Sequence, residues 1–164
     1  MLISRNAVKP AFSILNSPAV RVSLSSHGCR QVSPCPVSPP PLVPASGRLL
    51  PLYAVCVGRS GDKGDSANIA IIARHTSFFP HLVSQITPAI IKCHLKHLID
   101  KDGVVERYIV PGVHAVNFVV TRCLGGGGLE SLRMDRQGKG FAQVILGGVQ
   151  VLVPDDVPVE LARL

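Results

Sequence analysis

Acidic residues are absent from the first 51 positions, although the 164-residue chain contains ten of them. These positions hold five Lys or Arg, nine Ser and nine of the 14 prolines. Residues 52–164 carry 12 basic and ten acidic residues, so most of the formal net charge of +7 lies before them. A nucleic-acid-binding protein concentrates Lys and Arg on its folded domain, so this distribution argues against a nucleic-acid partner.

Several motifs of known chemistry are also missing. No run of 18 apolar residues occurs, which argues against a transmembrane helix and a membrane partner. The five cysteines form no CxxC pair, and no GK[ST] follows spaced glycines, so neither a zinc motif nor a Walker A loop is present. Cys93, His94 and His97 would point in different directions on a helix, whereas a metal site needs three converging ligands. We therefore predict no metal and no cofactor, and we assign no catalytic residue.

The composition of residues 1–51 predicts a disordered leader. Residues 1–20 are rich in Arg, Ser and Ala, and Arg5 and Lys9 would share one helical face, as in a mitochondrial transit peptide. The alternative is a disordered extension without function, which would leave the protein in the cytoplasm. Residues 33–46 are proline-rich and predict an extended linker. The leader is expected to precede one domain at residues 52–153 and a tail at 154–164.

Hydrophobic patterning within the domain predicts an α+β fold, a sandwich with helices packed on one face of a sheet. We expect strands at residues 52–57, 67–73, 104–110, 131–135 and 148–153, and helices at 87–99 and 141–146. Residues 113–124 are ambiguous: the apolar spacing fits a helix, but the β-branched content fits a strand. The glycine run that follows would make a natural helix C-cap, so we favour a helix there.

The segment 58–68, with the sequence GRSGDKGDSAN, holds the densest group of polar and glycine residues. We expect its first part to be a loop whose glycines turn backbone N–H groups toward one point, with basic side chains to hold an anion. Two aspartates would repel that anion, and they could instead tie the loop down through backbone N–H groups or hold a hard cation. The alternative is a hydrogen-bonded connection without a ligand. The candidate ligand-binding residues here are Arg59, Ser60, Gly61, Asp62, Lys63, Gly64, Asp65 and Asn68.

A second group of candidate residues lies further along the chain. Gly125, Gly126, Gly127 and Gly128 allow close approach of the backbone to a ligand or partner. His114 and Asn117 are candidates to support the ligand-binding loop from nearby, although for Asn117 we favour a role in the fold alone. We predict that residues 59–68 and 125–128 lie together at one end of the sheet. The alternative is that the two segments turn independently at opposite ends.

Three strings together resemble the small C-terminal module of the acyclic terpene utilisation (AtuA) family. They are GRSGDKGDSANIAIIAR at 58–74, VERYIVPGVHAVNFVV at 105–120 and LGGGGLESLRMDRQGK at 124–139. The resemblance implies a ferredoxin-like fold. In that family the module is fused behind a larger AtuA domain or encoded as a separate small protein, and the family is associated with breakdown of acyclic terpenes through acyl-CoA intermediates.

The resemblance implies an accessory or ligand-binding module. Its expected partners are a separate large AtuA-like chain, or a second copy of itself, and an anionic small molecule. The alternatives are a catalytic module that acts on an anionic acyl-CoA-type substrate through residues 59–68 and, last, a nucleic-acid-binding module.

Overall fold

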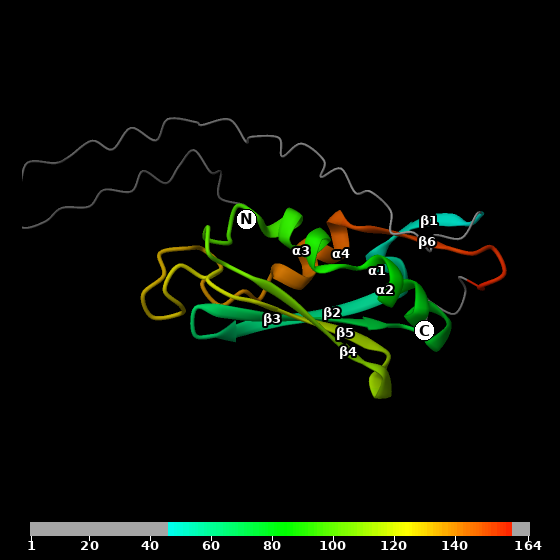
Figure 1. The fold of residues 1–164 in the computed structure, drawn as a ribbon, viewed down its shortest axis with the longest axis horizontal. Helices are drawn as coiled ribbons and strands as arrows, with labels where there is room; N and C mark the ends of the chain where they lie inside the picture. Colours follow the sequence, from blue (N-terminus) through cyan, green and yellow to red (C-terminus); the bar gives the residue numbers. More distant parts are fainter. Residues whose placement is uncertain (1–45, 159–164) are drawn as a thin grey trace, which may run out of the picture. The chain divides into compact units, whose positions relative to one another are not determined.

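The computed structural model of the protein describes residues 46–158 (Figure 1). The predicted transit peptide and nearly all of the predicted linker lie outside these residues. The strands are β1 Arg48–Pro51, β2 Cys56–Lys63, β3 Ser66–Ala73, β4 Val105–Val110, β5 Ala115–Val120 and β6 Gln150–Val153. The helices are α1 Leu52–Val55, α2 Phe79–Gln85, α3 Pro88–Leu95 and α4 Phe141–Gly148, with short 3₁₀ turns η2 Thr76–Phe78 and η3 Pro111–Val113. Among the described residues, no helix is long and apolar enough to cross a membrane.

Four antiparallel strands form the main sheet in the order β2-β3-β5-β4, and the helices cover one of its faces (Figure 1). The predicted α+β, ferredoxin-like arrangement is therefore confirmed. Strands β3, β4 and β5 with the helices α2 to α4 follow the first five elements of the ferredoxin-like pattern β-α-β-β-α-β. Strand β2, which comes before them in the chain, takes the sheet position of the sixth. Strands β1 and β6 pair as a separate two-stranded sheet.

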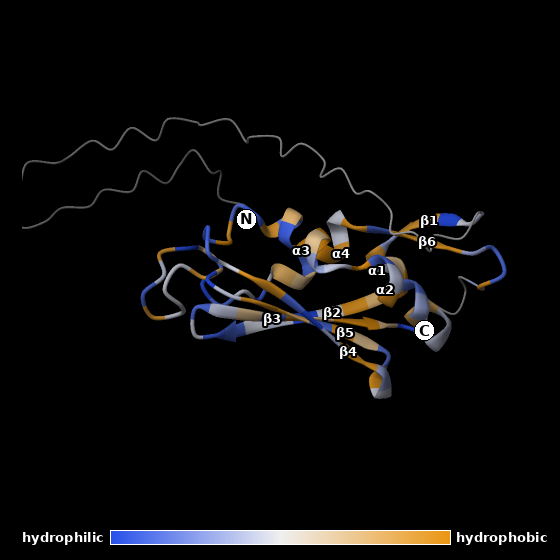
Figure 2. Ribbon diagram, in the orientation of Figure 1, coloured by the Kyte–Doolittle hydropathy of each residue, from blue (hydrophilic) through white to orange (hydrophobic). Residues whose placement is uncertain are grey.

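The core lies between the sheet and the helices, because alternate residues of each central strand point toward the helices. Figure 2 shows hydrophobic residues along β5 and in α4. The fully buried side chains of this interface include Ile69, Ile71, Phe118, Val120, Leu82, Ile91, Leu95 and Ile145. Burial of one such side chain stabilises the fold by about 1.5–3 kcal/mol. No helix of residues 46–158 covers the outer face of the sheet.

The helix favoured for residues 113–124 is wrong. Residues Ala115–Val120 form β5, which pairs with β3 on one side and β4 on the other. Helical spacing and strand alternation are hard to separate over a short valine-rich segment, and pairing on both sides favours the β-branched residues in a strand. The glycines at 125–128 therefore follow a strand and do not end a helix.

Other boundaries also differ from the sequence-based expectation. Residues Leu52–Val55 form one turn of helix, so the first predicted strand is wrong over most of its length. The helix predicted to end at residue 99 ends at Leu95. The strand predicted at 131–135 is irregular backbone. The helix predicted at 141–146 is confirmed as part of α4.

Two polar side chains join the helices to strands. Gln85, which is 7% exposed, donates from Nε2 to the Leu152 carbonyl oxygen and accepts from the Leu152 N–H, both at 2.8 Å. Arg107 reaches from β4 to the end of α2, where Nη1 donates to the carbonyl oxygens of Val83 at 2.9 Å and Ile86 at 3.0 Å. The amide of Gln85 thus pairs with β6 as a neighbouring strand would.

Replacing Gln85 with Leu is expected to lower the free energy of unfolding by about 1–3 kcal/mol, because it leaves the N–H and C=O of Leu152 without partners. Urea unfolding of the full chain measures this change. Gln150→Leu is the matched control, since Gln150 lies exposed on β6, the strand that contains Leu152. Equal stability of the two variants would contradict the role assigned to Gln85.

Candidate functional site

The segment predicted as an anion-binding loop is a β-hairpin, so the prediction of a loop at 58–66 is wrong. Strands β2 and β3 pair without interruption from Cys56 opposite Ala73 to Lys63 opposite Ser66. Only Gly64 and Asp65 form the turn, and Gly64 has a φ of +66°. Glycine in the first central position is the requirement of a type II′ hairpin turn. The glycine-rich sequence therefore continues a strand where a phosphate cradle was expected.

The pleat of β2 divides the predicted ligand residues between the two faces of the sheet. Ser60 lies opposite the buried Ile69 and points toward the helices. Arg59, Gly61 and Lys63 alternate with it and belong to the outer face, where Asn68 lies opposite Gly61. Asp62 is on the helix-facing side at the sheet edge. These residues do not converge on one point.

Ser60 connects the hairpin to the helix layer. Its side chain is buried, and Oγ donates to the Lys139 carbonyl oxygen at 3.2 Å and accepts from the Ala142 N–H at 3.0 Å. Asp135 accepts from the N–H groups of Lys139 at 2.9 Å and Gly140 at 2.7 Å. The two side chains together satisfy free N–H groups at the start of α4, as capping residues do.

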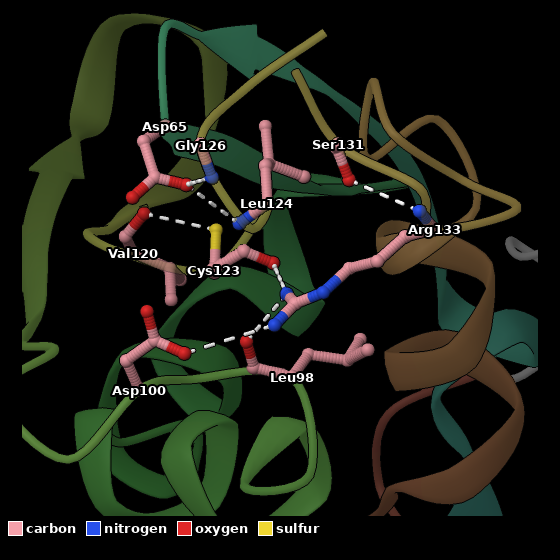
Figure 3. A network of polar contacts seen from close by, with 9 residues as sticks. All are labelled: Asp65, Leu98, Asp100, Val120, Cys123, Leu124, Gly126, Ser131 and Arg133. Carbon is pink, nitrogen blue, oxygen red and sulfur yellow. Dashed lines mark hydrogen bonds and ion pairs between the residues drawn. The ribbon is translucent and has the colours of Figure 1, made fainter.

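Asp65 binds the hairpin turn to the segment that follows β5 (Figure 3). Its Oδ1 accepts from the N–H groups of Leu124 at 3.2 Å and Gly126 at 2.9 Å, and its carbonyl oxygen accepts from the Cys123 N–H at 3.0 Å. The predicted proximity of residues 59–68 and 125–128 is therefore confirmed. The aspartate holds backbone together, which was the alternative given for it from the sequence.

Gly127 explains why this contact needs glycine. Its φ is +94°, and a Cβ there would lie 2.9 Å from the carbonyl oxygen of Gly64. Only a residue without a side chain allows the two backbones to approach so closely in that conformation. The glycine run thus has a packing reason within the fold.

Arg133 holds the other end of the same loop, and it was missed from the sequence because residues 131–135 read as a strand. Its Nη1 donates to the carbonyl oxygens of Leu98, at 2.7 Å, and of Cys123, and its Nη2 lies 3.7 Å from Asp100 Oδ1 (Figure 3). We call residues 125–137 the glycine loop. The loop is held near its start by Asp65, and the Arg133 side chain, which lies between Leu132 and Met134 in the chain, reaches back to Cys123 just before the loop begins.

The tip of the glycine loop exposes large apolar side chains. Leu129, Leu132 and Met134 are 101%, 102% and 105% exposed. Figure 1 shows the loop, in yellow to orange, projecting past the end of the sheet. Full exposure of three such side chains on one short loop is unusual, because soluble proteins rarely leave large apolar side chains grouped at the surface. Where they do, the group commonly marks an interaction site.

His114 and Asn117 do not join this group, so their predicted support of the loop is wrong. His114 precedes β5 at the opposite end of the sheet, where Nε2 lies 3.2 Å from Thr76 Oγ1 and the ring packs against Phe79. The eight residues of β3 separate the two ends by roughly 23 Å at about 3.3 Å per residue. Asn117 lies in the middle of the outer face, opposite Ala70 and Tyr108.

The two buried cysteines have no nucleophilic character at neutral pH. Burial raises the pKa of the Cys56 thiol to about 12 and that of Cys123 to about 11. Both thiols therefore stay protonated, and Cys123 Sγ donates to the Val120 carbonyl oxygen. Within residues 46–158, no group of three or more His, Cys, Asp or Glu is placed to hold a metal ion.

The sheet order and the helices on one face define an α+β protein of the ferredoxin-like class. The family model of the AtuA ferredoxin-like domain matches residues 50–150, and the chain belongs to this family. No curated protein and no solved structure matches the chain.

Asp65→Ala is expected to destabilise the full chain by about 1–3 kcal/mol, because the Leu124 and Gly126 N–H groups lose a charged acceptor. Urea unfolding measures the loss. Asp62→Ala is the matched control from the same hairpin, since the Asp62 carboxylate makes no hydrogen bond or ion pair within the described part of the chain. If Asp62→Ala lowers the free energy of unfolding more than Asp65→Ala does, the structural role assigned to Asp65 is wrong.

Gly127→Ala is expected to cost at least about 1–2 kcal/mol, the penalty of a left-handed backbone for a residue with Cβ. Gly128→Ala is the control, because the nearest atom to a Cβ there is 4.0 Å away. Thermal unfolding of both variants tests the close approach of the glycine loop to the hairpin turn. A midpoint no lower for Gly127→Ala than for Gly128→Ala would argue against it.

Proposed function

We propose that this protein is an accessory module that docks on a separate, larger AtuA-type chain through the tip of the glycine loop. By its family, the assembly would serve the breakdown of acyclic terpenes through acyl-CoA intermediates. The acid-free composition of residues 1–20 supports a mitochondrial location. The observation that carries the proposal is the full exposure of Leu129, Leu132 and Met134 on a loop whose base is fixed.

The energetics favour a role for these side chains in binding. Burial of each one against a partner is worth about 1.5–3 kcal/mol, so the three together supply several kcal/mol. Interfaces draw most of their affinity from a few such anchors at their centre. Glu130 and Arg136 lie exposed beside the tip and would belong to a polar rim.

Fixation of the loop at its base increases the affinity that these anchors can give. A flexible loop loses conformational freedom when it binds, and that loss reduces the affinity. Here the hydrogen bonds that Asp65 accepts and Arg133 donates order the base before any partner arrives. The same residues that hold the loop are thus part of the docking function, although they would not touch the partner.

The docking role is favoured over the catalytic alternative because the predicted ligand residues have other places in the fold. Ser60 and Asp65 bond to backbone groups, and Arg59 and Lys63 belong to the outer face. Lys63 Nζ donates to the carbonyl oxygen of Asp62. An acyl-CoA-type substrate would need these groups to converge around its phosphates or thioester.

Isothermal titration of the full chain with a large AtuA-type chain that lacks its own ferredoxin-like module tests the proposal. The triple variant Leu129→Ser, Leu132→Ser, Met134→Ser is expected to lose about 100-fold in affinity, or about 2.8 kcal/mol. The control is Leu49→Ser, Tyr53→Ser, Val144→Ser, which removes three exposed apolar side chains elsewhere and should bind as the wild type does.

Two results would contradict the proposal. One is an affinity that the loop variant leaves unchanged or that the control lowers equally. The other is binding of the wild-type chain to phospholipid vesicles that only the loop variant loses, which would make the loop tip a membrane anchor. Urea unfolding of each variant verifies that all are folded.

A further inference from the structure

The two edges of the main sheet differ in how they are protected against pairing with another strand. The β2 edge carries glycines and charged residues at 58–63, and Ser60 bonds it to the start of α4. The β4 edge has no Gly, Pro or Lys within Val105–Val110, and Tyr108, Ile109 and Val110 are 50%, 46% and 39% exposed. The two charged residues of β4 are engaged within the chain, since Arg107 bonds to the end of α2 and Glu106 accepts from the Tyr108 hydroxyl. Natural proteins usually protect a free edge with glycine, proline or free charges, so this edge is open to a partner strand.

The backbone of β4 is ready to pair on its free side. Thr121 N–H donates to the Val104 carbonyl oxygen at 2.9 Å, and in an antiparallel pair every second residue bonds to the same neighbour. The even-numbered residues of β4 therefore bond to β5. Val105, Arg107 and Ile109 direct their N–H and C=O groups to the free edge, where no described strand pairs with them.

We propose that two copies of the chain pair through β4 about a twofold axis perpendicular to the sheet, forming one continuous eight-stranded sheet. This symmetry keeps the helices of both copies on the same face. In the register centred on Tyr108, Arg107 lies opposite the partner's Ile109. By the twofold symmetry, Ile109 lies opposite the partner's Arg107. These two pairs use the N–H and C=O groups of Arg107 and Ile109 in each copy, four of the six backbone groups that face the free edge.

Side-chain chemistry selects this register. Centring the pair on Glu106 or Arg107 would place like charges directly opposite each other, which is destabilising. Centring it on Ile109 would place Pro111, which has no N–H, opposite Arg107, and would leave only the Ile109 pair with both of its backbone hydrogen bonds. The register centred on Tyr108 keeps two complete pairs and places Pro111 only opposite Val105, at the end of the strand. With Tyr108 at the centre, the two tyrosine rings meet on the outer face, and aromatic pairs of this kind stabilise a sheet.

The strand that pairs with the free edge of β4 is the β4 of a second copy, because this sequence can supply both strands of the antiparallel pair. The Arg107 guanidinium stays within its own copy, where it bonds to the end of α2, so its aliphatic stem is left to cover the partner's Ile109. The edge is separate from the tip of the glycine loop. Pairing through β4 therefore goes beyond the docking proposal and does not depend on it.

Analytical ultracentrifugation of the full chain tests the inference. The wild type is expected to sediment as a dimer, and Ile109→Pro as a monomer. The substitution removes an N–H that β5 does not use, and proline is tolerated at such positions of an edge strand. Ile109→Lys is the second variant in case proline perturbs the fold, and Val144→Lys on α4 is the control that should remain dimeric. A monomeric wild type, or a dimer that both Ile109 variants preserve, would overturn the inference.

Cross-linking tests the register itself. Under mild oxidation, Tyr108→Cys is expected to give a covalent dimer with a disulfide between the two substituted positions, located by peptide mass spectrometry. Tyr53→Cys, at a position 57% exposed, is the control and should give no such dimer. Failure of Tyr108→Cys to form this disulfide while the chain is dimeric would show that the copies meet elsewhere.

Discussion

The arrangement of this domain depends on one carboxylate, that of Asp65 in the turn between β2 and β3. A single oxygen accepts two backbone N–H groups from the segment that leaves β5, while the carbonyl of the same residue accepts a third. Hydrogen bonds to a charged acceptor are about twice as strong as those between neutral groups. They connect segments some 60 residues apart, and together with Arg133 they hold the glycine loop to the rest of the domain.

The order of strands explains why this connection is needed. In the ferredoxin-like pattern the edge strand beside β3 would come last in the chain, but here β2 fills that place from the N-terminal side. The hairpin turn that joins β2 to β3 therefore lies at the end of the sheet where β5 also ends. A loop that leaves β5 must pass this turn, and Gly127 allows it to do so at contact distance.

The class of the fold and the meeting of two glycine-rich segments could be predicted from the sequence, whereas the local role of the residues could not. Strand β3 and helix α4 have clear apolar patterns, and the helix expected from residue 87 does begin there, where the Thr87 side chain caps α3 and Pro88 is its first residue. Residues 115–120 were misread because valine spacing fits two periods, and only pairing with β3 and β4 decides between them. The strand at residues 58–63 could not be predicted because its glycines and charged residues are typical of a loop. In the structure they lie on an edge strand, where such residues hinder pairing with another chain. The contacts of Arg133 join residues far apart in sequence, so no local pattern indicates them.

Hydrogen exchange followed by mass spectrometry tests the central claim, that the glycine loop has a fixed base and an exposed tip that docks on a partner. In the free chain, the amides of Leu124 and Gly126 should exchange slowly and those of the exposed Leu129, Leu132 and Met134 quickly. Addition of the large AtuA-type chain should protect the tip and leave the outer face of the sheet unchanged. Rapid exchange at Leu124 and Gly126 in the free chain, or protection by the partner only on the outer face, would contradict the account.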